Sequence, residues 1–277
     1  MMRFKEMPIT PEQATKWLEG NVHNRALRDS TVMRYARDMK AGKWLLTHQA
    51  IAFNDEGVLI DGQHRLFAVI EAGVTVSMMV AWGVVDEAQA VIDGGLVRSA
   101  VDQIKLGHNY EGATNTHVAI VKRLARHSVR GALTSAEVFT LLKTHKAALD
   151  FTVSAFTRRV RGITITPVMA VVTRAFYTQN HERLETFCAR LCDGQVGDDE
   201  QPILLLRNYL LERPVTRAKV ATSSDEVIYG KTARALTAYL HGERLSTLYA
   251  ANSELFPLPA EKSVTLTGKA TSRRKAS

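Results

Sequence analysis

The chain has 277 residues, a formal net charge of +8, and 45% apolar and 23% charged side chains. A chain of this length can form one large core or two domains, and its balance of apolar and charged residues is that of a globular protein. Its apolar runs fall short of the roughly 20 residues that span a membrane, and its first residues do not begin a signal peptide. We therefore expect a cytoplasmic protein with no membrane partner.

The first part of the chain alternates short helices and strands. Thr10, Pro11 and Gln13 combine an N-cap residue, a first-turn proline and a glutamine three residues after the cap, which predicts a helix to about Glu19. The other elements that we expect are a helix over 30–41, strands over 44–46, 50–53, 58–60 and 74–82, and short helices that begin at Asp86 and Arg98. This order predicts a small mixed α/β domain.

The third of these strands leads into the run Asp61-Gly62-Gln63-His64-Arg65, which opens a helix. Gly62 permits a sharp turn, and the start of the helix directs backbone N–H groups and a positive dipole end outward. An imidazole and a guanidinium in this first turn, from His64 and Arg65, suit a bound phosphate. Asp61 has two interpretations: it caps the helix, or its carboxylate oxygens hold a magnesium ion.

This run resembles the DGQHR signature of the ParB/sulfiredoxin-like superfamily, which includes phage and mobile-element proteins described as ParB-like nuclease domains. In that superfamily the corresponding Gly-x-x-Arg turn holds nucleotide phosphates. The resemblance therefore implies a phosphate site at Gly62, Gln63, His64 and Arg65. It also implies a nucleoside triphosphate such as CTP or ATP, with Mg²⁺, as the ligand.

Two further segments extend the resemblance. Asn24 and Arg25 fall where ParB-like proteins have their first box, a short stretch with proline and arginine near the nucleotide. The run 93–98 resembles the Asp-x-Gly-x-x-Arg turn that follows the DGQHR helix in phage relatives, and it ends in Arg98. The resemblance adds these three residues as phosphate contacts, although a surface charge explains Arg98 equally well.

The chain departs from the family pattern at one informative position. ParB proteins carry Glu-Arg-Arg after the motif glycine, whereas Gln63 stands in the acidic place here, so a carboxylate that would help to hold a metal is missing. Sulfiredoxins carry a reactive cysteine at this position, so we do not expect sulfiredoxin chemistry. The two cysteines, Cys188 and Cys192, lie four residues apart in an expected helix, and reduced thiols are favoured over a zinc site.

Beyond residue 107 the apolar pattern becomes helical. The expected helices cover 117–130, 135–145, 147–160, 167–180, 182–191, 201–212 and 224–241. The predicted fold class is α+β: a small ParB/sulfiredoxin-like mixed α/β domain over 1–107 followed by an all-α domain over 108–256. A basic tail over 257–277, rich in Ser, Thr, Ala and Lys, is expected to be disordered.

Two groups of cations in the helical part favour a nucleic-acid partner. In the first group three cations are spaced by four residues along an expected helix, with a fourth beside them. The second group is a short cluster. The groups are Lys122, Arg123, Arg126 and Arg130, and Arg158, Arg159 and Arg161. Such cations displace counterions from a phosphate backbone and read little sequence. A solvated helix face has the same pattern, but two clusters in one domain favour DNA.

Two functions are compatible with these features. The first is a nucleotide-dependent DNA-binding or regulatory protein of phage or mobile-element type. The second is an enzyme of the same superfamily, a nuclease, NTP hydrolase or phosphotransferase. In that enzyme His64 would be the general acid or base, and Asp61 would hold a metal or activate a hydroxyl. The oligomeric state, including a homodimer, is left open.

Overall fold

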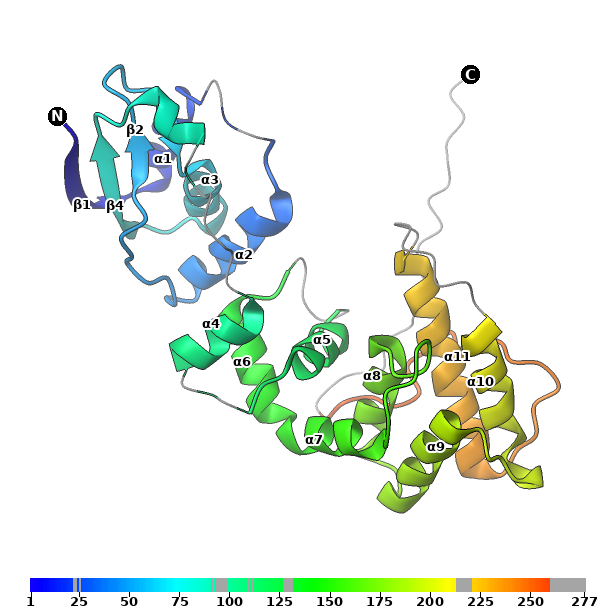
Figure 1. Ribbon diagram of the computed structural model, residues 1–277. Helices are drawn as coiled ribbons and strands as arrows, with labels where there is room; N and C mark the ends of the chain where they lie inside the picture. Colours follow the sequence, from blue (N-terminus) through cyan, green and yellow to red (C-terminus); the bar gives the residue numbers. More distant parts are fainter. Residues whose placement is uncertain are drawn as a thin grey trace, which may run out of the picture. The chain divides into compact units, whose positions relative to one another are not determined.

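The computed structural model describes residues 1–21, 24, 26–90, 92, 99–108, 110, 112–126, 132–212 and 221–259. The chain divides into two compact units (Figure 1). Unit 1 comprises Met1–His108 and Arg126–Val138, and unit 2 comprises Asn109–Ala125 and the described residues from Phe139 onward. The chain first passes from unit 1 into unit 2 after His108, one residue from the boundary expected at 107. The sequence does not indicate that a second segment, Arg126–Val138, also belongs to unit 1.

Unit 1 contains a four-stranded mixed sheet with the strand order β1-β4-β2-β3. The strands are β1 (Arg3–Ile9), β2 (Ile51–Phe53), β3 (Leu59–Asp61) and β4 (Val76–Trp82). β4 pairs antiparallel with β1, with Met7 opposite Met78, and parallel with β2. β2 and β3 form an antiparallel pair. This sheet, together with the helices of unit 1 and the helical remainder, confirms the predicted α+β class.

Three helices pack with the sheet into the core of unit 1. They are α1 (Pro11–Leu18), α2 (Asp29–Lys40) and α3 (Gln63–Ala72), and unit 1 also holds a short 3-10 helix (Asp86–Ala90) and α4 (Ala100–His108). Thr10 caps α1, because its hydroxyl accepts the Gln13 N–H at 3.2 Å. Leu66 and Val69 of α3 are fully buried in the core beside Val80 of β4. Burial of this apolar face fixes the start of α3 against the sheet.

Two features of unit 1 differ from the sequence prediction. β1 was not predicted, because it is an edge strand whose residues 3–6 are exposed and show no apolar alternation. Residues 44–46, predicted as a strand, lie in the loop between α2 and β2, where Leu45 is 77% exposed. A strand needs a hydrogen-bonded neighbour, and the sheet ends at β1 and β3.

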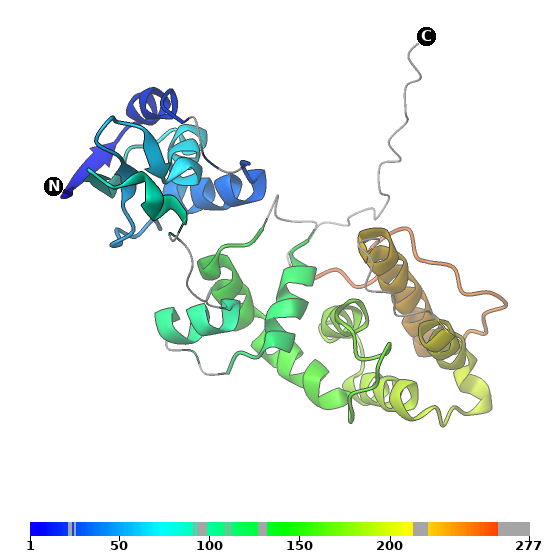
Figure 2. The ribbon, with the colours of Figure 1, turned by 45° about the horizontal axis from the view of Figure 1, so that its top comes forward.

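The elements of regular secondary structure described in unit 2 are helices joined by loops (Figure 2). Its helices are α5 (Asn115–Leu124), α7 (Lys146–Ala155), α8 (Thr166–Ala175), α9 (His181–Asp193), α10 (Gln201–Glu212) and α11 (Ala221–His241), and α6 (Ser135–Thr144) leads into it from unit 1. α8 is buried at every position from Pro167 to Ala175 and packs against α5, α7 and α11. A helix that is covered on all sides is the centre of its unit.

The C-terminal segment stays packed beyond the point where the tail was expected to begin. Phe256 and Leu258 are 3% and 8% exposed, so the described chain is anchored for two residues past 256. The rest of the expected tail, 260–277, lies outside the described residues. Within the part that the structure describes, no helix combines the length and hydrophobicity that crossing a membrane requires.

Candidate functional site

A cavity of about 880 Å³ in unit 1 opens beside the start of α3. Its lining comes from α2, from the loop 43–49, from the turn between β3 and α3, and from the beginning of α6. Pockets that hold small ligands have volumes of about 300–1,000 Å³, so a nucleotide would fit by size. The predicted phosphate turn therefore borders a cavity.

The turn between β3 and α3 depends on Gly62. Its φ of +106° is in the left-handed region, and a Cβ atom there would lie 2.5 Å from Cδ1 of Ile51. Gly62 is the N-cap of α3, so the prediction that Asp61 caps this helix is wrong. The Asp61 Oδ1 atom instead accepts the N–H of Gly62 at 2.6 Å, one residue before the amides that an N-cap side chain binds.

Arg65 points to the same carboxylate. Its Nη2 atom lies 2.8 Å from Asp61 Oδ2, and it also donates to the carbonyl oxygen of Ala50 at 3.0 Å. Nη1 donates to the carbonyl oxygen of Gln49. The Arg65 side chain is 12% exposed, against 34% for Asp61. The guanidinium that was predicted to bind phosphate thus already has an anionic partner, which comes from the same turn.

His64 is 8% exposed and fixes the beginning of α2. Its Nε2 atom accepts the backbone N–H of Arg28 at 3.1 Å. Arg28 is the N-cap of α2 and has no side-chain capping bond of its own. The Nε2 lone pair is therefore engaged, whereas a general base needs a lone pair directed at a substrate proton. The geometry of His64 is that of a positioning residue.

Gln63 and Asn24 belong to one hydrogen-bonded framework. The Gln63 Oε1 atom accepts from Asn21 Nδ2 at 3.2 Å, and Asn24 Nδ2 donates to the Leu59 carbonyl oxygen at 2.7 Å. These bonds tie the segment after α1 to β3 and to the turn. The other two predicted phosphate contacts, Arg25 and Arg98, lie outside the described residues.

Three cavity cations were missed by the sequence analysis. Arg28 and Arg34 line the cavity from α2, and Lys43 lines it from the following loop. Lys43 is near enough to Asp38 and Glu137 that its charge acts to lower the pKa of both carboxyls. A signal was present in the sequence, because Arg28, Thr31, Tyr35 and Asp38 recur at helical spacing and lie on one face of α2.

Aromatic rings form part of the same wall. The rings of Tyr35 and Trp44 meet edge to face with their centroids 5.4 Å apart. The guanidinium carbon of Arg34 lies 5.0 Å from the centroid of the Tyr35 ring, which is a cation–π distance. Cations and aromatic rings therefore line the same cavity, a combination that suits a ligand with an anionic and an aromatic part.

The beginning of α6 is held to α2 by charged groups. Arg37 bonds both oxygens of Glu137, at 2.9 and 3.1 Å, and burial, which acts to raise the pKa of Glu137, is outweighed by the bonds from Arg37 and Thr134 that lower it. Burial raises the pKa of the neighbouring Asp38 carboxyl, against a lowering hydrogen bond from Thr134. These contacts hold Thr134 and Asp38, which line the cavity, beside one another.

The carboxylates of the cavity do not fit a resident Mg²⁺. Magnesium is bound through free carboxylate oxygens, usually completed by water and substrate phosphates. Both oxygens of Asp61 are engaged by the protein, and Asp38 accepts a hydrogen bond from Thr134 while burial raises its pKa. Over the residues that the structure describes, no group of three or more His, Cys, Asp or Glu side chains is placed to hold a metal ion. We assign no metal to the turn.

The first predicted nucleic-acid stripe does not form. α5 ends at Leu124, so Arg126 lies beyond the helix, and Arg130 is outside the described residues. Arg123 has a side chain that is only 7% exposed, and it binds both oxygens of Glu226 at 2.8 and 2.9 Å. The prediction of an exposed Arg123 is wrong because its face of α5 packs inward, against α11. Lys122 remains exposed.

The second group of cations is exposed. Arg158, Arg159 and Arg161 lie in the loop between α7 and α8, because α7 ends at Ala155 and not near 160 as predicted. Arg158 donates to the carbonyl oxygen of Cys192 at 2.9 Å, which orients the loop on the end of α9. The guanidinium groups of Arg159 and Arg161 are exposed at the surface of unit 2 and are available to a phosphate backbone.

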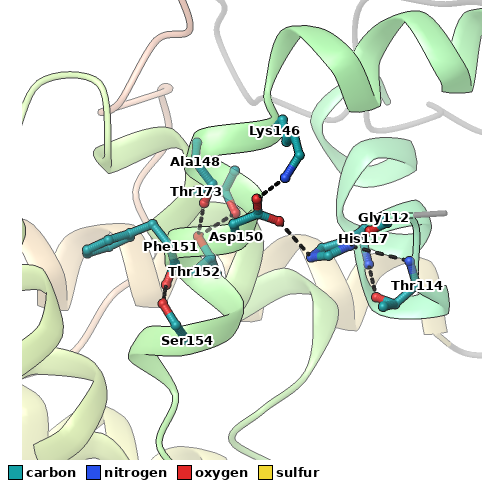
Figure 3. Close-up of polar contacts among 10 residues, drawn as sticks. All are labelled: Gly112, Thr114, His117, Lys146, Ala148, Asp150, Phe151, Thr152, Ser154 and Thr173. Atoms are coloured by element: carbon teal, nitrogen blue, oxygen red, sulfur yellow. Dashed lines mark hydrogen bonds and ion pairs between the residues drawn. The ribbon is translucent and has the colours of Figure 1, made fainter. Parts of the chain in front are cut away.

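A polar cluster in unit 2 joins α5 to α7 (Figure 3). The buried His117 directs Nε2 at Asp150 Oδ1, 3.7 Å away, and Lys146 pairs with the other oxygen of Asp150. His117 Nδ1 lies 3.3 Å from the Thr114 amide nitrogen and 3.2 Å from the Gly112 carbonyl oxygen. This cluster caps α5 and connects it to its neighbour, which is a packing role.

The two cysteines share one face of α9, as predicted, and both are free and buried. Burial raises the pKa of both thiols, which suits packing better than reactivity. No family model, curated protein or solved structure matches the chain. The features that point to a function are the cavity of unit 1 and the exposed arginines of unit 2.

Proposed function

We propose that unit 1 binds the phosphates of a nucleotide in the cavity beside α3, and that the protein is a nucleotide-dependent DNA-binding or regulatory protein. The observation that carries this proposal is the set of three cations, Arg28, Arg34 and Lys43, that line a cavity of nucleotide size. Lys43 acts on the nearby carboxylates of Asp38 and Glu137, yet cations still outnumber carboxylates in the lining. A cleft with an excess of positive charge attracts anions.

The balance of charges in the cavity supports an anionic ligand. The lining holds four cationic side chains and two carboxylates. One carboxylate, Asp61, is paired with the fourth cation, Arg65. Asp38 remains to oppose the other three cations, and burial raises the pKa of its carboxyl. A phosphate group, with two or more negative charges and acceptor oxygens on several sides, matches such a site.

The aromatic residues favour a nucleotide over a smaller phosphate. Trp44 and Tyr35 line the cavity together with Arg34 and Lys43. Nucleobases stack on aromatic side chains and on guanidinium planes, so the base and the phosphates of one ligand would both find partners. CTP and ATP are both candidates, because no feature of the described lining selects one base.

A binding role is favoured over catalysis. The enzyme hypothesis needs His64 as an acid or base and Asp61 as a metal ligand or activating group. Both side chains are held by hydrogen bonds to the backbone of their own unit, His64 to Arg28 and Asp61 to Gly62. The nucleotide is therefore proposed as a regulatory ligand and not as a substrate.

For DNA, we propose the loop of Arg158, Arg159 and Arg161 in unit 2 as the contact. All three residues are exposed, and Arg158 is oriented by the end of α9. Replacing Arg159 and Arg161 by Glu should weaken DNA binding and reduce the salt dependence of the affinity, since each lost phosphate contact lowers the slope of log K against log salt by about 0.9. Unchanged binding at low salt would remove this loop from the proposal.

The nucleotide site is tested by calorimetric titration of ATP, CTP and inorganic phosphate. The double variant Arg28→Ala/Lys43→Ala should lose at least about tenfold in nucleotide affinity, the scale of one charge-assisted hydrogen bond. Lys40→Ala is the matched control, because Lys40 is an exposed cation at the end of α2 that does not line the cavity. Equal affinities for wild type and the double variant would contradict the proposal.

A further inference from the structure

We infer that Asp61 is a built-in competitor for anions: its carboxylate occupies the place of a phosphate at the turn, and the ligand binds more tightly when Asp61 is neutralised. This inference concerns the regulation of the cavity and rests on the proposed function. It starts from the observation that the groups predicted to hold a phosphate, the Gly62 amide and the Arg65 guanidinium, both hold Asp61.

The carboxylate uses both of its oxygens. Oδ1 accepts the Gly62 N–H at 2.6 Å, and Oδ2 accepts from Arg65 Nη2 at 2.8 Å. An amide at a glycine turn and a guanidinium are the partners that proteins use for phosphate oxygens. Asp61 is 34% exposed and lines the cavity, so a ligand in the cavity can reach the pair and compete for Arg65.

Arg65 keeps its position without Asp61. The carbonyl oxygens of Gln49 and Ala50 accept from its two terminal nitrogens, and its side chain is only 12% exposed. Removal of the carboxylate charge therefore leaves an oriented guanidinium at the cavity wall, with no carboxylate partner from the part of the chain that the structure describes. A poorly hydrated cation without a partner is unfavourable, and an incoming phosphate would relieve that cost.

A purely structural role makes the opposite prediction. If the pair only braces the turn against the start of β2, neutralising Asp61 lowers stability and leaves anion affinity unchanged. If the effect is only that of net charge in the cavity, neutralising Asp38 should act equally. Asp38 lines the same cavity but bonds neither Gly62 nor Arg65. The variant Asp38→Asn is therefore the matched control.

The experiment titrates inorganic phosphate, AMP and ATP into wild type, Asp61→Asn and Asp38→Asn, with thermal melts to verify folding. We expect Asp61→Asn to bind at least about fivefold more tightly than wild type and clearly more tightly than Asp38→Asn. The gain should vanish in Asp61→Asn/Arg65→Gln, which removes the released guanidinium. Asp61→Ser, which keeps an acceptor for the Gly62 amide, provides a second variant if Asp61→Asn folds poorly.

The outcomes separate the two proposals. If wild type binds nucleotide and Asp61→Asn and Asp61→Ser do not exceed Asp38→Asn, the competitor role is overturned and the nucleotide site stands. If the gain survives in Asp61→Asn/Arg65→Gln, Arg65 is not the group that Asp61 blocks, and the inference fails. If neither wild type nor the Asp61 variants bind any of the three ligands, both proposals fail.

Discussion

Each unit contains an arginine–carboxylate pair that is largely withdrawn from solvent, and the two pairs differ in what surrounds them. In unit 2, Arg123 binds both oxygens of Glu226 and lies 4.8 Å from the ring of Tyr229. In unit 1, Arg65 binds one oxygen of Asp61 at the wall of a cavity. The exposed fractions of the two pairs are similar, at 7% and 29% for Arg123 and Glu226 and 12% and 34% for Arg65 and Asp61, so the difference lies in what each pair contacts.

The surroundings decide what each pair can do. The Tyr229 ring beside Arg123 is buried, and this burial raises the pKa of its hydroxyl well above the ordinary value. The carboxylates of the two pairs are exposed to a similar degree, 29% for Glu226 and 34% for Asp61. The pairs differ in their contacts: Arg123 bonds both oxygens of its carboxylate and contacts an aromatic ring, whereas Arg65 bonds one oxygen of Asp61 beside a cavity.

The largest expected effect is the loss of the pair in unit 2. Arg123→Ala should lower the free energy of unfolding of unit 2 by about 3 kcal/mol, because two charge-assisted hydrogen bonds to Glu226 and the cation–π contact with Tyr229 are lost. Urea unfolding followed by circular dichroism measures this change. Arg159→Ala, an exposed arginine of the same unit, should stay within about 0.5 kcal/mol of wild type. Equal stabilities of the two variants would show that the bonds of Arg123 to Glu226 do not stabilise unit 2.

A smaller effect is expected from the backbone of the turn in unit 1. Gly62→Ala should destabilise the protein by about 2 kcal/mol, because alanine is strained at a φ of +106° and its Cβ would meet Ile51 at 2.5 Å. Gly57→Ala is the control, since Gly57 also has a positive φ but nothing lies within 4 Å of an added Cβ. Thermal or urea unfolding should show about half the loss for this control.

The pair in unit 1 should contribute less than the pair in unit 2. Arg65→Ala is expected to lower the free energy of unfolding by about 1.5 kcal/mol, because it loses one charge-assisted hydrogen bond to a carboxylate where Arg123→Ala loses two. The comparison with Arg123→Ala by urea unfolding measures the difference directly. A loss for Arg65→Ala as large as that for Arg123→Ala would show that the number of bonds to the carboxylate does not decide the contribution of the pair.

The smallest effect concerns pH and the wall of the cavity. The pKa of Asp38 is raised by burial, so folding favours its protonated form, and the stabilisation is lost as the pH rises through the raised pKa. Wild type should therefore lose stability relative to Asp38→Asn as the pH increases from about 4 to 7. Melting temperatures of the two proteins over this range measure the trend. A difference that does not change with pH would contradict the raised pKa.

Glu137, beside Asp38, should show the opposite trend. Its pKa is lowered, since the hydrogen bonds from Arg37 and Thr134 outweigh its burial, so its contribution is present near neutral pH and is lost on acidification. The melting temperature of Glu137→Gln should approach that of wild type as the pH falls below about 4. Parallel curves for the two proteins would show that the bond from Arg37 does not favour the ionised carboxylate.

Local signals in the sequence were sufficient for much of the fold. Thr10, Pro11 and Gln13 identified the start of α1, and the bounds of α10 match the predicted 201–212. These features depend on neighbours within four residues along the chain, where side-chain type and backbone geometry are directly linked. The glycine turn between β3 and α3 was found for the same reason, because Gly62 is required by its own backbone angle.

The properties of charged side chains were decided by tertiary structure. Arg123 and Lys122 are adjacent in sequence, but one faces Glu226 of α11 and the other faces solvent, and helical spacing alone does not tell which face packs inward. β1 was missed since its partner β4 lies some 70 residues away and stabilises it by hydrogen bonds that leave no apolar pattern.

The amino-acid sequence by itself determined the α+β class, most helices, and the turn at Gly62, since each follows from contacts along a few consecutive residues. Only the folded chain decided that Arg28, Arg34 and Lys43 share a cavity and that Arg65 is already occupied by Asp61. The reason is physical: the free energy of a charge depends on the water and counter-charges around it, and these are set by segments that meet only when the chain folds.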